Sequence, residues 1–155
     1  MQVNNMKRIY VNEQWCLGCH LCEYECMYAN SGLDEMFKLK GKAGKDILPR
    51  IQVEGDEKSP IHFAVNCRHC SGTACVNGCI AGALTKTDEG MVVIDKEKCV
   101  GCFTCVLLCP FGAIMPAADG KAAQKCMLCT DNIKNGEPNC VKYCPNNAIV
   151  YEERD

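Results

Sequence analysis

The sixteen cysteines of this 155-residue chain fall into four groups of four. The first and third groups have the spacing C-x2-C-x2-C-x3-C, which is typical of [4Fe–4S] cluster sites. The second group has four residues in its middle gap, and the fourth group has ten. Sixteen thiolates at four per cluster predict four [4Fe–4S] clusters. In chain order the groups are Cys16, Cys19, Cys22, Cys26; Cys67, Cys70, Cys75, Cys79; Cys99, Cys102, Cys105, Cys109; and Cys126, Cys129, Cys140, Cys144.

Two other uses of so many cysteines must be considered, namely a disulfide scaffold and a zinc site. Disulfides need an oxidising compartment. The first fifteen residues show no apolar segment, cleavage site or twin arginine, so we expect the cytoplasm, where thiols stay reduced. Zinc sites usually join two separated C-x2-C pairs. Three cysteines at i, i+3 and i+6 favour a cluster instead, but a zinc-binding interaction module remains an alternative.

The fourth cysteine of each group is expected to cross to a neighbouring cluster. Three cysteines at i, i+3 and i+6 can wrap three corners of a cubane, and the fourth iron needs a ligand from elsewhere. In two-cluster ferredoxins the fourth cysteine of each run ligates the other cluster. Pro110 and Pro145 follow two of these cysteines and fix the backbone there. The sequence therefore predicts clusters in close pairs, which suits electron transfer.

Charge argues against nucleic-acid binding. The formal net charge is −2 with neutral cysteines. Sixteen thiolates and four oxidised cores bring it to about −10, because bound ions belong in the count. The four lysines Lys38, Lys40, Lys42 and Lys45 form the main basic cluster, and we expect a solvated, mobile loop at 38–45.

One uncharged stretch is long enough for a membrane span. Residues 99–118 include no charged side chain. Four cysteines at ligand spacing, Pro110 and Pro116 identify this stretch as chain wrapped around a cluster instead. No membrane span is therefore predicted, and the protein is expected to be soluble or a peripheral subunit.

An internal repeat predicts the architecture. Each unit has an entry segment, three cysteines, a short helix, a fourth cysteine and an apolar exit strand, which the first unit lacks. The predicted fold class is α+β and mostly irregular, with two pseudo-symmetric ferredoxin-like 2[4Fe–4S] modules of short strands and single-turn helices. They form one unit over 1–155: residues 1–30 with 119–155 make one module and 61–118 the other, and 31–60 is an insertion or linker. With few aromatic residues, the apo chain is not expected to fold.

Short β-rich segments locate the expected strands. A hairpin with glycine at its turn is expected from 83–85 to 91–94. Residues 48–54 alternate in polarity and predict one more strand within the insertion. The other expected strands are 8–11, 61–65 and 148–151.

No motif in the sequence predicts a substrate site. There is no G-x-G-x-x-G, no P-loop and no nucleophile–base motif. His20 and His69 lie inside cysteine loops, but each group already has four cysteines, so both histidines are expected to hydrogen-bond to sulfur or backbone. The chain is therefore predicted to relay electrons without catalysing a reaction.

Three segments carry a resemblance to a known family: NCRHCSGTACVNGCIAGA from Asn66, MVVIDKEKCVGCFTCVLLCPFGA from Met91 and KCMLCTDNIKNGEPNCVKYCPNNAI from Lys125. They resemble the four-cluster iron–sulfur subunits of dimethyl sulfoxide reductase, formate dehydrogenase and formate hydrogenlyase. In length and in the residues of these segments, the chain is similar to the soluble subunits that serve nickel carbon monoxide dehydrogenase. Small subunits of tungsten aldehyde oxidoreductases are an alternative, as is a free polyferredoxin.

The resemblance implies how the ligands pair. The first group would pair with the last, and the two middle groups with each other. The implied sets are Cys16, Cys19, Cys22 and Cys144 (set 1); Cys26, Cys126, Cys129 and Cys140 (set 2); Cys67, Cys70, Cys75 and Cys109 (set 3); and Cys79, Cys99, Cys102 and Cys105 (set 4). The implied partners are a redox enzyme, with carbon monoxide dehydrogenase first, and an acceptor such as a flavoprotein, a hydrogenase or a ferredoxin.

Overall fold

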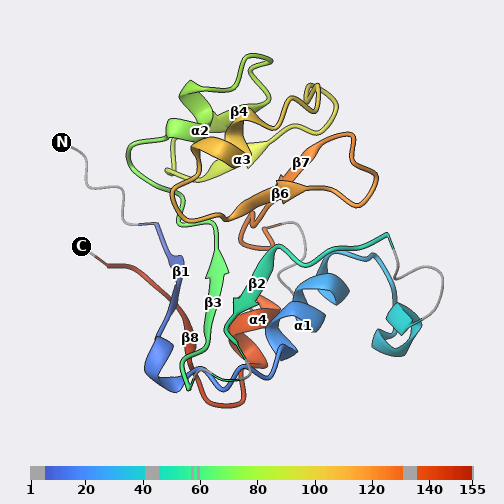
Figure 1. Cartoon of the computed structure of the whole chain (residues 1–155), viewed down its shortest axis with the longest axis vertical. Helices are drawn as coiled ribbons and strands as arrows, with labels where there is room; N and C mark the ends of the chain where they lie inside the picture. Colours follow the sequence, from blue (N-terminus) through green and yellow to red (C-terminus); the bar gives the residue numbers. More distant parts are fainter. Residues whose placement is uncertain (1–5, 41–45, 57, 59, 131–135, 155) are drawn as a thin grey trace.

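The computed structural model describes residues 6–40, 46–56, 58, 60–130 and 136–154. The strands of this part of the chain form two-stranded antiparallel pairs, and the helices are short. This confirms the predicted α+β, largely irregular fold class. Figure 1 shows two groups of elements, one above the other along the longest axis.

The lower group contains both ends of the described chain. Strand β1 (Arg8–Val11) pairs with β8 (Ile149–Glu152), and Ile9 lies opposite Tyr151. Helix α1 (Leu21–Ala29) packs against α4 (Asn139–Lys142), although the two helices are more than a hundred residues apart in sequence. Strand β2 (Ile51–Glu54) pairs with β3 (Phe63–Asn66) beside α1 (Figure 1).

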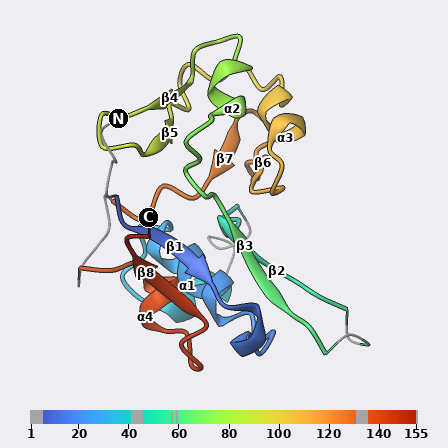
Figure 2. The same ribbon diagram turned by 90° about the vertical axis from the view of Figure 1, so that its left-hand side faces the viewer.

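The upper group repeats the pattern with shorter elements. Helices α2 (Ala74–Asn77) and α3 (Thr104–Leu108) pack together, as α1 and α4 do below. Figure 2 shows both helices beside the strands of this group. The hairpin of β4 (Leu84–Lys86) and β5 (Val92–Ile94) is followed by that of β6 (Ile114–Pro116) and β7 (Ala123–Lys125).

Most of the expected strands are confirmed. The β4–β5 hairpin turns at Gly90, whose φ of 91° favours glycine, as predicted. Strand β2 confirms the strand predicted within residues 48–54. Two pairings cross the predicted module boundaries, because β7 pairs with β6 and β2 pairs with β3.

Two local predictions were wrong. Residues 38–40 belong to a 3₁₀-helix, η2 (Met36–Lys40), because Leu39 is buried and anchors this segment. The rest of the predicted loop, 41–45, lies outside the described residues. Helix α1 has nine residues where a single turn was expected. It holds both Cys22 and Cys26, and no glycine or proline interrupts it before Asn30.

Cysteine side chains form much of the core. One buried cluster joins Ile9, Ile51 and Ile149 to cysteines of three different groups. A second lies between α2, α3 and the two hairpins, and it too includes cysteines. The core is thus built around thiols rather than aromatic rings. Within the described residues no helix combines the length and apolar character that crossing a bilayer requires.

Candidate functional site

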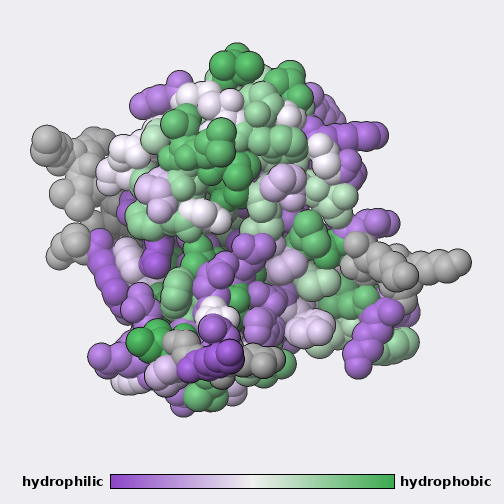
Figure 3. All heavy atoms as spheres, in the orientation of Figure 1, coloured by the Kyte–Doolittle hydropathy of each residue, from purple (hydrophilic) through white to green (hydrophobic). Residues whose placement is uncertain are grey.

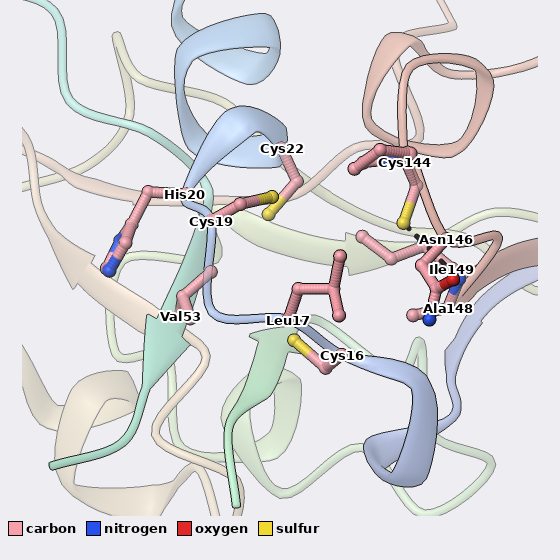
Figure 4. A pocket seen from close by; sticks show the side chains of 11 residues that line it. Cys16, Leu17, Cys19, His20, Cys22, Val53, Cys144, Asn146, Ala148 and Ile149 are labelled. Atoms are coloured by element: carbon pink, nitrogen blue, oxygen red, sulfur yellow. Dashed lines mark hydrogen bonds between the residues drawn. The ribbon is translucent and has the colours of Figure 1, made fainter. Parts of the chain in front are cut away.

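Four cysteines from the two ends of the chain line a cavity in the lower group. Figure 4 shows Cys16, Cys19, Cys22 and Cys144 around it, with the Leu17 side chain drawn between them. Cys16 follows the 3₁₀-helix η1 (Glu13–Trp15), and Cys144 follows α4. Burial, followed by repulsion from Glu23, Cys19 and Cys16, raises the pKa of the Cys22 thiol to about 12. These four residues are the implied set 1.

A corresponding cavity lies in the upper group. Its cysteines are Cys79, Cys99, Cys102 and Cys105, which are the implied set 4. Cys105 is buried on α3, whereas Cys102 is exposed in the loop before this helix. The two cavities thus take the same kind of residues from equivalent loops.

The residues of set 2 lie deepest. Burial raises the pKa of both the Cys126 and Cys129 thiols to about 11. The pKa of Cys140 is also raised, by burial and then by repulsion from Cys126, Cys26 and Cys129. Each of these thiols has at least one other member of the set as an electrostatic neighbour, so the structure brings the four cysteines together from α1, α4 and the loop after β7.

The residues of set 3 meet where the two groups of elements join. Burial raises the pKa of the Cys70 and Cys75 thiols, and repulsion from Cys67 and Cys109 adds to it. Cys67 directly follows β3, and Cys109 directly follows α3. A fourth cysteine from a different loop therefore joins three cysteines of one group here, as it does in the other sets.

The four sets follow one another in a row. Cys22 of set 1 is an electrostatic neighbour of Cys140 in set 2. Cys126 of set 2 shares one core cluster with Cys67 of set 3 and is its electrostatic neighbour. Sets 3 and 4 share the second core cluster. The two exposed cysteines, Cys19 and Cys102, lie in sets 1 and 4, at the two ends of the row.

Backbone N–H groups donate to the cysteine sulfurs at repeated positions. The residue two places after the first cysteine donates in two groups: His69 to Cys67 and Leu128 to Cys126, both at 3.5 Å. The alanine four places after the fourth cysteine does the same in two groups, at 3.3–3.4 Å; these bonds are Ala113 to Cys109 and Ala148 to Cys144. Such donors stabilise thiolate charge, so the sites suit anionic metal-bound sulfur.

Other donors come from distant segments, and sequence reasoning missed them. The N–H of Arg50 donates to the Cys26 sulfur at 3.2 Å, and that of Ala123 donates to the Cys99 sulfur at 3.5 Å. Arg50 lies in the segment that was predicted to be an insertion. No motif could have indicated these bonds, because only the folded arrangement places the two segments beside the cysteine loops.

The cysteine spacing and the four grouped sets agree with a comparison of the sequence with known families. Residues 59–154, which are more than half of the chain, match the model described as a 4Fe-4S dicluster domain. The chain belongs to this family. The match confirms the predicted [4Fe–4S] cofactor type. It includes the second, third and fourth cysteine groups, and the first group precedes it.

Curated relatives differ in how much of their length the chain covers. It is 33% identical to the electron transport protein HydN of Escherichia coli, over 90% of this chain and 84% of that protein. It is 30% identical to the probable anaerobic dimethyl sulfoxide reductase chain YnfG of E. coli, over 92% and 71%. Identity to the putative oxidoreductase AegA of E. coli is 38% over 91% of this chain, which spans only about a fifth (21%) of AegA.

The solved active-site complex BamBC of benzoyl coenzyme A reductase contains a chain of similar fold. The TM-score is 0.50 at 22% identity, and the alignment covers 96% of this chain and 78% of that one. At this identity the similarity concerns the fold alone.

Proposed function

We propose that the chain is a non-catalytic electron-transfer subunit with four [4Fe–4S] clusters held by sets 1 to 4. The observation that carries the proposal is the row of four cysteine sets with an exposed cysteine in each end set. A redox relay requires neighbouring centres inside the protein and access for partners at both ends. Each cluster would thus be bound by three cysteines of one group and one cysteine of another.

The spacing of the thiols favours clusters over zinc. Four thiolates around one zinc ion lie about 2.3 Å from the same point. Among the described residues, no three His, Cys, Asp or Glu side chains are grouped closely enough to hold a single metal ion. Sets 1 and 4 surround cavities instead. This arrangement suits a polynuclear cluster, whose iron atoms hold the four sulfurs further apart.

The protein supplies burial and hydrogen bonds to each site. When bound, a [4Fe–4S] cluster accepts and releases single electrons. Buried cysteines such as Cys26 and Cys140 exclude water from set 2, and N–H donors such as Ala148 stabilise the negative charge on sulfur. The raised thiol pKa values mean that protons must leave as iron binds, so metal binding and folding are coupled.

Apolar residues surround the outermost sets, where partners would dock. Leu17 lines the set 1 cavity and Val100 lines the set 4 cavity, and both are mostly exposed. Each of them directly follows the first cysteine of its group. Figure 3 shows hydrophobic residues gathered over the α2–α3 part of the upper group. An apolar contact beside a cluster excludes water and suits a small, transient electron-transfer interface.

The partner enzyme that we propose is carbon monoxide dehydrogenase, on the basis of the sequence resemblance. A tungsten aldehyde oxidoreductase is the second candidate. The names of YnfG and of a sulfite dehydrogenase subunit from Allochromatium vinosum, which is 33% identical over 88% of this chain, support a role beside a separate oxidoreductase. The acceptor would be a flavoprotein, a hydrogenase or a ferredoxin. The thiols must stay reduced, which favours the cytoplasm.

Anaerobic purification followed by metal and sulfide assays tests the cofactor content. We expect about sixteen irons and sixteen acid-labile sulfides per chain, at four per cluster. Stoichiometric zinc, or iron and sulfide contents that are repeatably near half of these values, would contradict the four-cluster proposal.

Stopped-flow mixing with reduced enzymes tests the relay and its partner. Carbon monoxide dehydrogenase with carbon monoxide should bleach the visible absorbance of the clusters. Bleaching only by an aldehyde oxidoreductase with aldehyde would change the partner and keep the relay. If neither enzyme nor a reduced ferredoxin exchanges electrons with the chain, the electron-transfer function is wrong.

A further inference from the structure

Lys125 is a fully buried lysine between two of the cysteine sets. It ends β7, directly before Cys126, and has 0% exposure. Its Nζ donates to the carbonyl oxygen of Val92 at 2.5 Å and to that of Cys126 at 2.7 Å. An ammonium has three N–H donors, and these bonds use two of them. The side chain is therefore held in one place inside the protein.

A buried ammonium needs negative charge nearby, because carbonyl oxygens alone do not neutralise it. The ion pairs found among the described residues join other side chains, and Lys125 is in none of them. The charge of Lys125 must be compensated by something other than a carboxylate.

Lys125 lies between the loops of sets 2 and 3. Its Nζ binds the carbonyl of Cys126 in set 2 and that of Val92, whose N–H donates to His69 in the loop of set 3. Burial raises the pKa of both the Cys75 and Cys126 thiols, whereas the positive charge of Lys125 lowers the pKa of each. Cys75 belongs to set 3 and Cys126 to set 2, so one ammonium faces both inner sets. A cluster with four thiolates is an anion in either redox state, since the thiolates outweigh a core of about +2 charge.

We propose that Lys125 is the charged residue that sets the reduction potentials of the two inner clusters. The inference rests on the proposed function, because it requires clusters at sets 2 and 3. Reduction adds one electron to an already negative cluster in a water-poor interior, where a fixed positive charge is weakly screened. Lys125 therefore favours the reduced state of both inner clusters and keeps them accessible to electrons from either end of the row.

Lys86 offers a matched comparison on the same protein. Its Nζ also donates to two backbone carbonyls, those of Cys70 and Ser71 in the loop of set 3, at 3.3 and 3.2 Å. Lys86 is exposed, however, so water and salt screen its charge. Lys86 is thus an exposed lysine beside the loop of set 3, whereas Lys125 is buried and binds the carbonyls of Val92 and Cys126.

The test is a redox titration of the anaerobic holoprotein, followed by electron paramagnetic resonance, for K125Q, K125M, K125R and K86Q. Signals that disappear in Cys126→Ser and Cys67→Ser identify the inner clusters. In K125Q and K125M, the ratio of reduced to oxidised inner cluster at a fixed solution potential should fall about tenfold. For a one-electron couple this corresponds to a midpoint potential that is lower by about 59 mV. K125R should restore the ratio, and K86Q should leave it unchanged.

Each other outcome has a defined meaning. Unchanged inner potentials in K125Q, equal shifts of all four clusters, or a K125R that behaves like K125Q overturn the proposal. If K125Q and K125M lose iron, a loss that is confined to the inner clusters and is reversed in K125R supports the proposal. Loss of all four clusters in any variant overturns the proposal. A wild-type protein without four clusters would refute the proposed function itself, before any variant is compared.

Discussion

Lys125 and His69, both fully buried, bind the two backbone polar groups of the same residue, Val92. The N–H of Val92 donates to His69 Nδ1 at 3.0 Å, and its carbonyl accepts from Lys125 Nζ. Burial, with smaller effects from Lys125 and Arg8, lowers the pKa of His69 to about 3, so the ring is neutral and Nδ1 is free to accept. Strand β5 is thus fixed between the loops of sets 2 and 3.

Replacing His69 with alanine should loosen the site of set 3. The buried Val92 N–H would lose its acceptor, which costs about 1–3 kcal/mol, and a cavity would add to this. We expect the clusters to bleach about tenfold faster in guanidinium under anaerobic conditions, measured by the decay of visible absorbance. The rate of loss is the appropriate quantity because unfolding with bound clusters is not two-state.

The matched control is His20→Ala. His20 lies in another cysteine loop but is exposed, and its ring contacts Glu23 at 2.9 Å. An exposed pair of this kind contributes about 0–1 kcal/mol. Equal bleaching rates for the two variants would show that the His69 contact does not stabilise the site.

Helix α1 provides a direct test of the crossed ligand pairing. Cys22 and Cys26 are both buried and lie one turn apart on this helix. Under the proposed assignment, Cys26→Ala damages the cluster of set 2, and Cys22→Ala damages that of set 1. Mössbauer or electron paramagnetic resonance spectra should show a three-iron signal from a different cluster in each variant.

The two cysteine variants are controls for each other, because they remove the same group from the same helix. The crossed assignment fails if both substitutions alter the same cluster. It fails also if Cys26→Ala removes the cluster bound by Cys16 and Cys19 while leaving that of Cys126 intact.

Gly101 is required by a close backbone approach as well as by its conformation. Its φ is +69°, and an added Cβ would lie 2.5 Å from the carbonyl oxygen of Lys121. Gly101→Ala should therefore distort the loop of set 4 and lower the iron content by about one cluster, or four irons per chain.

Gly120→Ala is the control. Gly120 has a similar φ of +65° with open space around it, so only the conformational cost of about 1–2 kcal/mol applies. Similar iron contents in the two variants would exclude the steric explanation.

The sequence predicted four groups of cysteines because spacing along the chain directly limits what one loop can wrap. The assignment of ligands to sets 1 to 4 came from the family resemblance and stays a prediction. It also predicted β2 and the β4–β5 hairpin, which depend on local polarity and on Gly90. The burial of Lys125 could not be predicted. A lysine before a cysteine looks like any other lysine, and only the packing of β5 against β7 encloses it. Bonds from Arg50 and Ala123 to distant sulfurs escape prediction for the same reason.

Leu17 and Val100 should control electron exchange at opposite ends of the row. Both are exposed apolar residues that line the cavities of sets 1 and 4. Leu17→Glu and Val100→Glu place a charge in the proposed docking surfaces without removing a ligand. One substitution should slow reduction by the donor enzyme about tenfold, and the other should slow oxidation by the acceptor by a similar factor. The reason is that burying the new charge in the interface weakens docking, and a tenfold effect corresponds to about 1.4 kcal/mol. Iron content should stay at the wild-type value in both variants.

Leu48→Glu is the control for this last prediction. Leu48 is also an exposed apolar residue, at 39% exposure, and it lines a different depression from those of sets 1 and 4. Its substitution should leave both rates unchanged. Stopped-flow measurement of each half-reaction separates the two ends, because the donor reduces the chain in one experiment and the acceptor oxidises the pre-reduced chain in the other. If Leu17→Glu and Val100→Glu both slow the same half-reaction, both ends of the row exchange electrons with the same partner and the through-relay is wrong. If neither differs from Leu48→Glu, partners reach the clusters elsewhere on the surface.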